Sequence, residues 1–590
     1  MGRPAELGAP RRLPDLAAEV GSGAAARARV IAWLGPGLAL AAAVFYLIVT
    51  GLQLGRPLMY DDANFALGAR AVSDTGQPFG NQGWMSERGD FSQREQWALW
   101  HPPLYIYLLG GVVHLGGWNP PVLRLLGLLG GLASGLLSYV LAVELTRGPP
   151  PARALAGGLA TVLVLLCPLV VQSTLVVDID LTLLLPLSLL FLLLYARLER
   201  AGAQGRRWLV LVPLFSLLLW AKMTNPLPLL AVIVTWQLLR GRPLRAGRDL
   251  LGIGLGGMAL FGASWLLIGR TFGWPLDMPF GVNLVQWQDS ADVARRAYTS
   301  PGAFLEGLQP SVLWLGPGLV ALGLVGTAVR VAELARCWRF RRSDLLIGLL
   351  VLLVLGYVNK SAGGFAKYQV ALAPLLAILA APLLASAVCA HARLTTALSV
   401  LGALVAAIVT LRLVRDDWTQ HQTWAVEPLA GAWLLGIVVV ALLAGSLRRL
   451  AGPAALASLL GLTVGWSLGT DLYQAAAPYS TTYWYGTTGT SEAARWVDEH
   501  LAPEQTYVAA KEVAIRAIDQ RYVDQDNLIT FVSAGRGFNG TWAGEPVAAL
   551  VVWQREPYVA SLFERAAPAA GYHETARFGD YVVYEPGSGS

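Results

Sequence analysis

The sequence predicts a polytopic α-helical membrane protein that ends in a small α/β domain outside the membrane. Its 590 residues are 55% hydrophobic and only 14% charged, and the mean hydropathy is +0.52. Soluble domains carry about 25% charged residues, so this composition excludes an ordinary soluble protein. Apolar runs long enough to cross a bilayer fill the chain up to residue 470, and from Thr490 onward helical and strand-like patterns alternate.

The arginines lie mostly in short loops between apolar runs, which accounts for the net charge of +6 without a nucleic-acid partner. Arginine in such loops marks the cytoplasmic face under the positive-inside rule. The three cysteines, Cys167, Cys337 and Cys389, lie in or beside apolar segments without metal-ligand spacing, so we expect packing roles and no disulfide framework. The abundance of Ala, Gly and Leu, with Arg favoured over Lys, indicates a bacterial protein of the cell membrane.

Residues 1–29 are rich in Ala, Arg and Pro and are expected to form a cytoplasmic tail. The apolar run 30–52 follows this tail and is long enough to be the first span, so a cleaved signal peptide is not expected. Arginines before the run place the N-terminus inside the cell and the loop 53–120 outside.

Within this outer loop, the apolar segment from Leu104 to Gly117 is predicted to lie at the membrane interface. Prolines bracket the segment and His114 interrupts it, which leaves it shorter than the roughly 20 residues that a crossing needs. A crossing would also turn the basic loop of Arg147 and Arg153 outward, against the positive-inside rule. The tryptophans expected at the level of the lipid headgroups are Trp97, Trp100 and Trp118.

The apolar runs of the whole chain predict about thirteen spans, an odd number that places the residues after Asp471 outside. The run 208–239 is broken at Lys222–Pro226 and has arginines on both flanks, which predicts a hairpin of two short helices with its tip outward. One long tilted helix is the alternative, because each arm is shorter than a normal span. The remaining spans are expected at about 121–146, 154–174, 181–198, 250–268, 311–333, 344–358, 368–389, 394–412, 429–447 and 453–470.

Residues 471–590 are expected to form a small α/β domain on the outer face, next to a membrane domain at 30–470. The pattern predicts an amphipathic helix at Ser491–Leu501 and a second helix near Tyr558–Ala566, and it contains no catalytic motif. The strand-like runs are Thr506–Ala510, Asn527–Val532, Val547–Trp553 and Tyr581–Tyr584.

With this topology, the unusual polar groups gather at the outer membrane boundary. Ionised groups so close to hydrocarbon are costly, which favours a functional role. The mixture suits an anionic lipid headgroup, because cations hold a phosphate while a carboxylate takes a proton from an acceptor. Helix capping by His101 and the aspartates, and interface anchoring by the lysines, are the structural alternatives. The residues are Asp61, Asp62, His101, Asp178, Asp180, Lys222, Lys360, Lys367 and Tyr368.

In their order along the chain, these motifs resemble the GT-C membrane glycosyltransferases, most closely the protein O-mannosyltransferase branch and the related lipid A aminoarabinose transferase. The resemblance covers about residues 30–390. Asp61-Asp62 looks like the Asp-Glu pair of that superfamily, whose first Asp is the catalytic base, although Asp in the second place departs from the pattern. His101-Pro102-Pro103-Leu104 matches the mannosyltransferase form of a motif that begins with Lys in the lipid A enzyme.

Two further motifs extend the resemblance. Asp178 resembles the acid of the second outer loop, and Lys367-Tyr368, followed by Pro374, looks like the basic-Tyr pair that faces the lipid phosphate. The resemblance implies Asp61 and Asp62 as catalytic residues. Together with the charge pattern, it indicates a set of substrate-binding residues: His101, Asp178, Lys222, Lys367 and Tyr368.

The function expected from these residues is transfer of a hexose or pentose from a polyprenyl-phosphate donor to a protein, lipid or glycan acceptor on the extracytoplasmic face. Single displacement with inversion, with Asp61 as the base, is the expected mechanism. A transporter or flippase of lipid-linked sugars is the alternative, but it predicts charges at mid-membrane and paired halves, and the sequence has no visible repeat. No cofactor is assigned, and a divalent metal is left open, because no ligand cluster decides the question.

Overall fold

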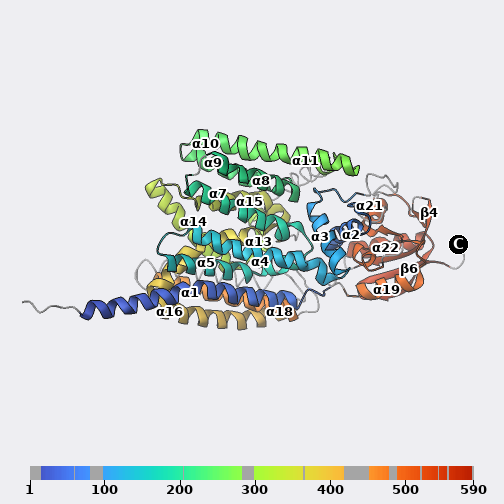
Figure 1. The fold of residues 1–590 in the computed structure, drawn as a ribbon. Helices are drawn as coiled ribbons and strands as arrows, with labels where there is room; N and C mark the ends of the chain where they lie inside the picture. Colours follow the sequence, from blue (N-terminus) through green and yellow to red (C-terminus); the bar gives the residue numbers. More distant parts are fainter. Residues whose placement is uncertain are drawn as a thin grey trace, which may run out of the picture.

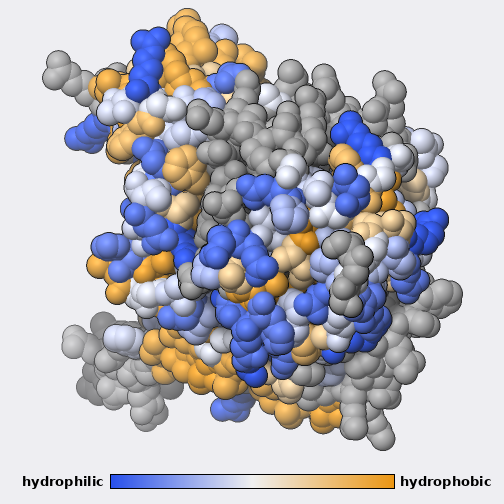
Figure 2. Space-filling model, turned by 90° about the vertical axis from the view of Figure 1, so that its right-hand side faces the viewer, coloured by the Kyte–Doolittle hydropathy of each residue, from blue (hydrophilic) through white to orange (hydrophobic). Residues whose placement is uncertain are grey.

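The structure is a computed structural model of the chain. It describes residues 15–56, 58, 60–79, 97–202, 205–281, 298–362, 366–417, 451–476, 488–517, 521–533, 535–542, 544–554 and 557–587. Long helices run side by side through most of the molecule, and the strands gather at one end of them (Figure 1). Seen from that end, the surface is largely hydrophilic, with hydrophobic residues along the flanks (Figure 2).

Seven helices in the described part of the chain are long and apolar enough to cross a membrane. A bent pair, α5 (Pro150–Leu165) and α6 (Pro168–Leu175), makes an eighth if the two count as one span. Four shorter apolar helices of 10–17 residues lie beside them. The predicted fold class is therefore confirmed, whereas the count of about thirteen spans is not, and the predicted span 429–447 lies outside the described residues.

The first helix, α1, spans Asp15–Gly51, so the segment expected as a tail enters this helix at Asp15, well before the predicted span. Next, α2 (Tyr60–Thr75) and α3 (Leu104–Gly116) pack against each other, and a Cβ at Gly110 would lie 2.7 Å from Val72 Cγ1. At 1.5 Å per residue, the 13 residues of α3 cover about 20 Å, less than the hydrocarbon thickness of about 30 Å. This length agrees with an interfacial helix.

The predicted span 154–174 is two helices rather than one, because α5 and α6 meet at an angle of 56°. Pro168 explains the break, since it lacks the N–H that would continue the ladder of α5. Both helices lie against α4 (Pro120–Leu145), where a Cβ at Gly127 would be only 2.4 Å from Thr174 O. Glycine on α4 therefore lets α6 approach closely, as small residues do between membrane helices.

A π-helical turn, η1 (Asp180–Leu184), leads into α7 (Leu185–Arg200), and a 3₁₀ turn, η2 (Gly205–Val210), then precedes the predicted hairpin. The hairpin is present as α8 (Leu211–Ala221) and α9 (Pro226–Leu239). Trp208 before α8 and Trp236 near the end of α9 both pack on Tyr195 of α7, with ring centres 5.3 and 6.4 Å away. Lys222 between the helices contacts Asp180 at the opposite end of α7, so the chain does turn back on itself.

Further helices complete the bundle. The predicted span 311–333 is interrupted at Gly316. The element α16 agrees with the two predicted spans at 368–389 and 394–412, because its backbone is non-helical at His391 (φ −140°, ψ 52°), between them. The elements are α10 (Pro243–Arg248), η3 (Asp249–Leu255), α11 (Gly256–Phe272), α13 (Pro301–Leu315), α14 (Pro317–Cys337), α15 (Asp344–Ala362), η4 (Ala366–Gln369), α16 (Leu372–Asp417) and α18 (Ala451–Ala476).

The C-terminal part contains a six-stranded sheet with the order β2-β1-β4-β6-β5, and β3 pairs with β4. Strand β1 is parallel to β2 and β4, whereas β6 is antiparallel to β4 and β5. The strands are β1 (Thr506–Ala509), β2 (Arg521–Asp524), β3 (Thr541–Trp542), β4 (Glu545–Trp553), β5 (Tyr572–Phe578) and β6 (Tyr581–Pro586). The helices are α19 (Thr490–His500), α20 (Lys511–Ala514), α21 (Gln525–Ser533) and α22 (Pro557–Ala569).

One strand-like run was interpreted wrongly: Asn527–Val532 lies in helix α21. Asp524 accepts a hydrogen bond from the Asp526 N–H at 3.0 Å, an arrangement that favours the start of a helix. The domain also contacts the membrane part, since Trp118 Nε1 donates to Ile515 O at 2.9 Å. The C-terminal part therefore lies beside α2 and α3 (Figure 1).

Candidate functional site

The short loop between α6 and α7 carries two aspartates that are both buried in the protein. Asp178 and Asp180 are each 7% exposed, and the extended residues Val176 and Val177 lead into them. Asp178 Oδ1 accepts the Ile179 N–H at 2.6 Å, which holds that carboxylate against its own backbone. A buried carboxylate is costly unless it is paired, so each should have a cation nearby.

Each aspartate does have its own lysine, and the two lysines come from different parts of the chain. Lys222, at the tip of the α8–α9 hairpin, lies 2.9 Å from Asp180 Oδ1. Lys367, in η4, lies 2.5 Å from Asp178 Oδ2. All four side chains are less than 10% exposed. The site is therefore a pair of balanced, nearly buried ion pairs.

Tyr368 joins the two ion pairs. The ammonium of Lys222 lies 5.0 Å from its ring centre, and the ammonium of Lys367 lies 5.3 Å from it. Both distances are within the range of cation–π attraction. The structure thus brings together four of the five predicted substrate-binding residues.

Asp62 supports this loop from the first turn of α2. Its Oδ1 accepts the Val177 N–H at 2.8 Å, and its Oδ2 lies 3.6 Å from Arg124 Nη2. Arg124, fully buried in α4, also donates to the main-chain oxygens of Leu175, at 2.7 Å, and Leu54. Asp62 and Arg124 therefore hold the chain directly before Asp178.

His101 lies half-buried immediately before α3, and Tyr105 is one turn further along the chain. Tyr105 is fully buried, and the charges of Asp178, Asp62 and Lys367 act on its hydroxyl group. Phe65 of α2 packs edge-on against it at 5.1 Å. Tyr105, four residues after the fifth predicted substrate-binding residue His101, is therefore part of the surroundings of the ion pairs.

An apolar cavity leads away from the ion pairs. Its volume is about 50 Å³, and it lies between α7, α9, α15 and α16. Asp180, Asn225 and Tyr368 form the polar part of its wall. The rest is mainly aliphatic and includes Leu185, Leu189, Leu192, Leu229, Leu349, Leu353 and Leu375. Aliphatic walls with polar groups at Asp180, Asn225 and Tyr368 suit contact with an apolar chain that carries a polar head.

Asp61 and Lys360 lie on helices α2 and α15, but their side chains are outside the described residues. Among the described side chains, no three His, Cys, Asp or Glu residues are grouped so that they could share a metal ion. Metal dependence stays open.

Comparison with protein-family models and with curated proteins finds no match. Solved structures do match over almost the whole chain. ArnT from Cupriavidus metallidurans bound to undecaprenyl phosphate has a TM-score of 0.55 at 16% identity, covering 94% of this chain and 98% of the other. Its apo form gives 0.52 at 17% identity, covering 93% and 98%. The chain has the GT-C fold. The resemblance predicted from the sequence motifs is thereby confirmed at the level of the fold.

Sequence reasoning missed Arg124 and Tyr105 as parts of the site. Arg124 carried a signal, because it is a charge inside an apolar run and such charges face the protein interior. Tyr105 stands directly after the His-Pro-Pro-Leu motif but has no distinctive spacing of its own. Its role follows only from the packing of α2 on α3.

Proposed function

We propose that this protein is a glycosyltransferase that takes a sugar from a polyprenyl-phosphate carrier and transfers it to an acceptor at the outer face of a bacterial cell membrane. The observation that carries the proposal is that Lys222 and Lys367 both lie against Tyr368, which lines the polar part of an apolar cavity. A polyprenyl phosphate has this chemistry, with an anionic head on an apolar chain. The GT-C fold supports the same function.

The two lysines are the phosphate-binding groups in this proposal. The aspartates keep both ammonium groups charged and in place before the donor arrives, so little rearrangement is needed on binding. Entry of the phosphate then gives each lysine a second anionic partner. The apolar part of the cavity removes the carrier chain from its surroundings and helps to fix where the sugar lies.

The transfer itself is a single displacement at the anomeric carbon. An acceptor oxygen forms a bond to that carbon as the bond to the phosphate oxygen breaks, and the electron pair leaves with the phosphate. The lysines stabilise this charge, while Asp61 takes the acceptor proton as general base. Asp62 is a positioning residue, because its carboxylate already binds Val177 N–H and faces Arg124.

The test uses the full-length protein purified into lipid nanodiscs. Undecaprenyl-phosphate-linked hexoses and pentoses are supplied one at a time with candidate peptide, lipid and glycan acceptors, and products are identified by mass spectrometry. The proposal requires an acceptor whose mass rises by one sugar residue, together with free undecaprenyl phosphate. Movement of the labelled donor across liposome membranes with no change in mass would instead establish a flippase.

A further inference from the structure

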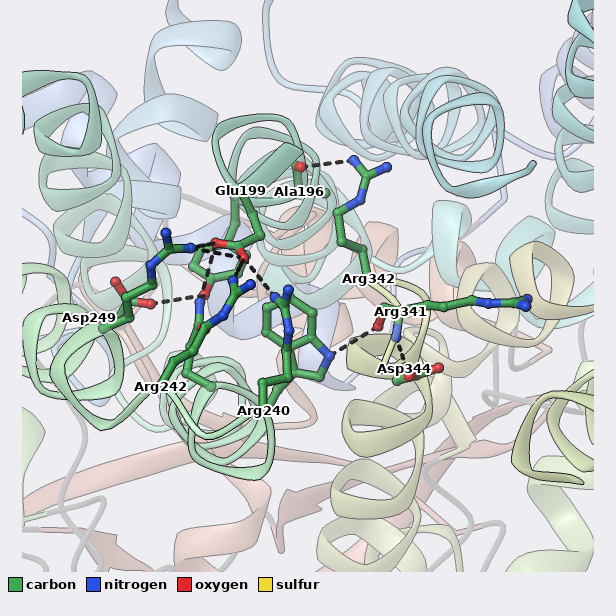
Figure 3. Close-up of polar contacts among 12 residues, drawn as sticks. Ala196, Glu199, Arg240, Arg242, Asp249, Arg341, Arg342 and Asp344 are labelled. Atoms are coloured by element: carbon green, nitrogen blue, oxygen red, sulfur yellow. Dashed lines mark hydrogen bonds and ion pairs between the residues drawn. The ribbon is translucent and has the colours of Figure 1, made fainter. Parts of the chain in front are cut away.

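At the other end of α7, far from the lysines, arginines gather around two glutamates, and Figure 3 shows those at Glu199. Glu199, in the last turn of α7, lies 2.6 Å from Arg240 and 2.7 Å from Arg242. Glu144, at the end of α4, lies 3.0 Å from Arg200 and 2.5 Å from Arg342. From Asp180 to Glu199 the helix rises roughly 28 Å, about the thickness of the hydrocarbon layer. This cluster therefore lies at the opposite membrane boundary from the candidate site.

Four separate parts of the chain build the cluster. They are the α4–α5 connection, the end of α7, the end of α9 and the α14–α15 connection. Main-chain bonds hold the last of these in place: Trp236 Nε1 donates to Arg341 O at 3.0 Å, and Arg341 N donates to Asp344 Oδ2 at 2.6 Å (Figure 3). The backbone that carries Arg341 and Arg342 is thus fixed without the help of either guanidinium.

The cluster surrounds a cavity of about 440 Å³, within the range of small-molecule sites. Six arginines and two glutamates line it, which leaves an excess of four positive charges on its wall. Next to the wall, Arg242 and Arg245 also pair with Glu199, and Arg330 pairs with Asp344. The lining arginines are Arg147, Arg153, Arg200, Arg240, Arg341 and Arg342.

Two of these arginines are crowded together without full compensation. Arg147 is exposed and, among the described residues, has no hydrogen bond or ion pair, and its charge acts on Arg341. Arg341 pairs with Glu333 at 2.6 Å, but its Nε is buried without a hydrogen-bond partner in the described part of the chain. Two guanidinium groups on the wall of one cavity favour an anion between them.

Orientation of the protein in the membrane is the simpler explanation for arginines at this boundary. It requires only positive charge in the loops and no cavity. Capping of helix ends is a second explanation, and it applies to Arg153, which donates to Val143 O, and to Arg342, which donates to Ala196 O. Neither explanation accounts for Arg147 and Arg341 facing a cavity that has room for a ligand.

We propose that this cavity, the arginine pocket, binds a phosphate-bearing anion. Guanidinium groups match phosphate oxygens in geometry and remain charged at any physiological pH. The phosphate can come from a lipid headgroup of the inner leaflet or from a soluble phosphorylated compound, since both present the same atoms. This site is separate from the donor site and does not depend on the proposed transfer reaction.

The test compares two double variants that remove the same charge. Arg147→Gln with Arg341→Gln removes two guanidinium groups from the pocket wall, and the main-chain bonds of Arg341 hold its backbone in place. Arg336→Gln with Arg339→Gln is the matched control, because both side chains are exposed near the same boundary and do not line the pocket. Binding of inorganic pyrophosphate is measured by calorimetry in phosphatidylcholine nanodiscs. Retention of phosphatidylglycerol is measured by native mass spectrometry from mixed micelles.

We expect the protein to bind at least one probe, and the pocket variant to bind it about tenfold more weakly or worse, as loss of charge-assisted bonds predicts. The control variant should keep its affinity at equal ionic strength. Pyrophosphate binding points to a soluble ligand and phosphatidylglycerol retention to a lipid. Absence of binding to both probes, or an equal loss in the control variant, overturns the proposal. Asp61→Asn should leave probe binding unchanged, which separates this result from any failure of the transferase assay.

Discussion

Charge is balanced near the first residue of α7 and unbalanced near its last. At Asp180 every described cation has an anion of its own, all four side chains are nearly buried, and Tyr368 lies between them. At Glu199 several arginines share one carboxylate, and the cavity beside it keeps a positive excess. Balanced buried pairs give a site that is rigid before its ligand arrives. An unbalanced open pocket gives a site that is completed by its ligand.

This contrast sets what a substitution should do at each end. Removing one member of a buried pair leaves an uncompensated charge, which costs about 3–5 kcal/mol. Removing one arginine from an excess relieves repulsion, so its cost should fall on ligand binding rather than on folding. The predictions below test these two expectations, beginning with the largest effect.

Asp61→Asn should abolish most of the transfer while leaving the fold and donor binding intact. The amide keeps the shape of the carboxylate but takes no proton, so we expect a loss of about 10²-fold or more, as for general-base removal. Turnover with saturating donor and acceptor is the measurement. Asp62→Asn is the comparison, since its carboxylate is already bound to Val177 N–H and near Arg124. Loss in Asp62→Asn with normal rates in Asp61→Asn would move the base by one residue.

Lys367→Met should weaken donor binding and also destabilise the protein. The lost phosphate contact is worth about 1.5–3 kcal/mol, and Asp178 is left without its partner at 2.5 Å. Donor affinity is measured by titration of the carrier lipid, and stability by thermal unfolding in detergent.

The double variant Lys367→Met with Asp178→Asn separates these two effects. Because it removes both charges, it should recover most of the stability but none of the affinity. Unchanged donor affinity in Lys367→Met would reduce Lys367 to an interface anchor.

Glu512, in the C-terminal domain, is a buried acid that is only partly balanced. Burial raises its pKa to about 7, although Tyr581 donates a hydrogen bond to it at 3.0 Å. The folded domain therefore binds a proton that the unfolded chain releases near pH 4.5, so stability should fall as the pH rises from about 4.5 to 7 and level off above that.

The size of this fall should be about 1–3 kcal/mol. Hydrogen exchange of the β1 and β4 amides at pH 5 and at pH 8 measures it. Glu512→Gln should show little difference between the two pH values. An equal or greater stability at pH 8 in the unmodified protein would contradict a raised pKa.

The sequence predicted the architecture well wherever the positive-inside rule or a hydrophobic period applied. Arginines on both flanks of 208–239 predicted the hairpin that Trp208, Trp236 and Tyr195 now establish. The same bookkeeping placed Asp178, Lys222 and Lys367 at one boundary. Which lysine meets which aspartate did not follow, because the pairing depends on how η4 and the hairpin tip approach the α6–α7 loop.

Local breaks were the weakest part of the prediction. Pro168 signals the bend between α5 and α6, but an apolar run of the right length outweighed it. Asn527–Val532 is so short that its apolar residues fit the period of a strand as well as that of a helix. In the structure, Asp524 accepts a hydrogen bond from the Asp526 N–H, which favours the start of a helix. The arginine pocket could not be predicted from the sequence, because its residues come from four separate parts of the chain. Each arginine taken alone matches the positive-inside pattern.

The smallest effect should come from an ion pair that belongs to neither end of α7. Arg577 lies 2.9 Å from Glu574 on strand β5, but the side chains are 53% and 44% exposed. Exposed pairs gain little, because water screens the attraction and two flexible side chains must be ordered, so Arg577→Gln should change stability by less than about 0.5 kcal/mol. Thermal unfolding beside the Lys367→Met variant gives the comparison directly, with the same instrument and buffer. A loss as large as that of Lys367→Met would mean that burial does not set the importance of an ion pair in this protein, and the contrast between balanced buried charge and exposed charge would have to be abandoned.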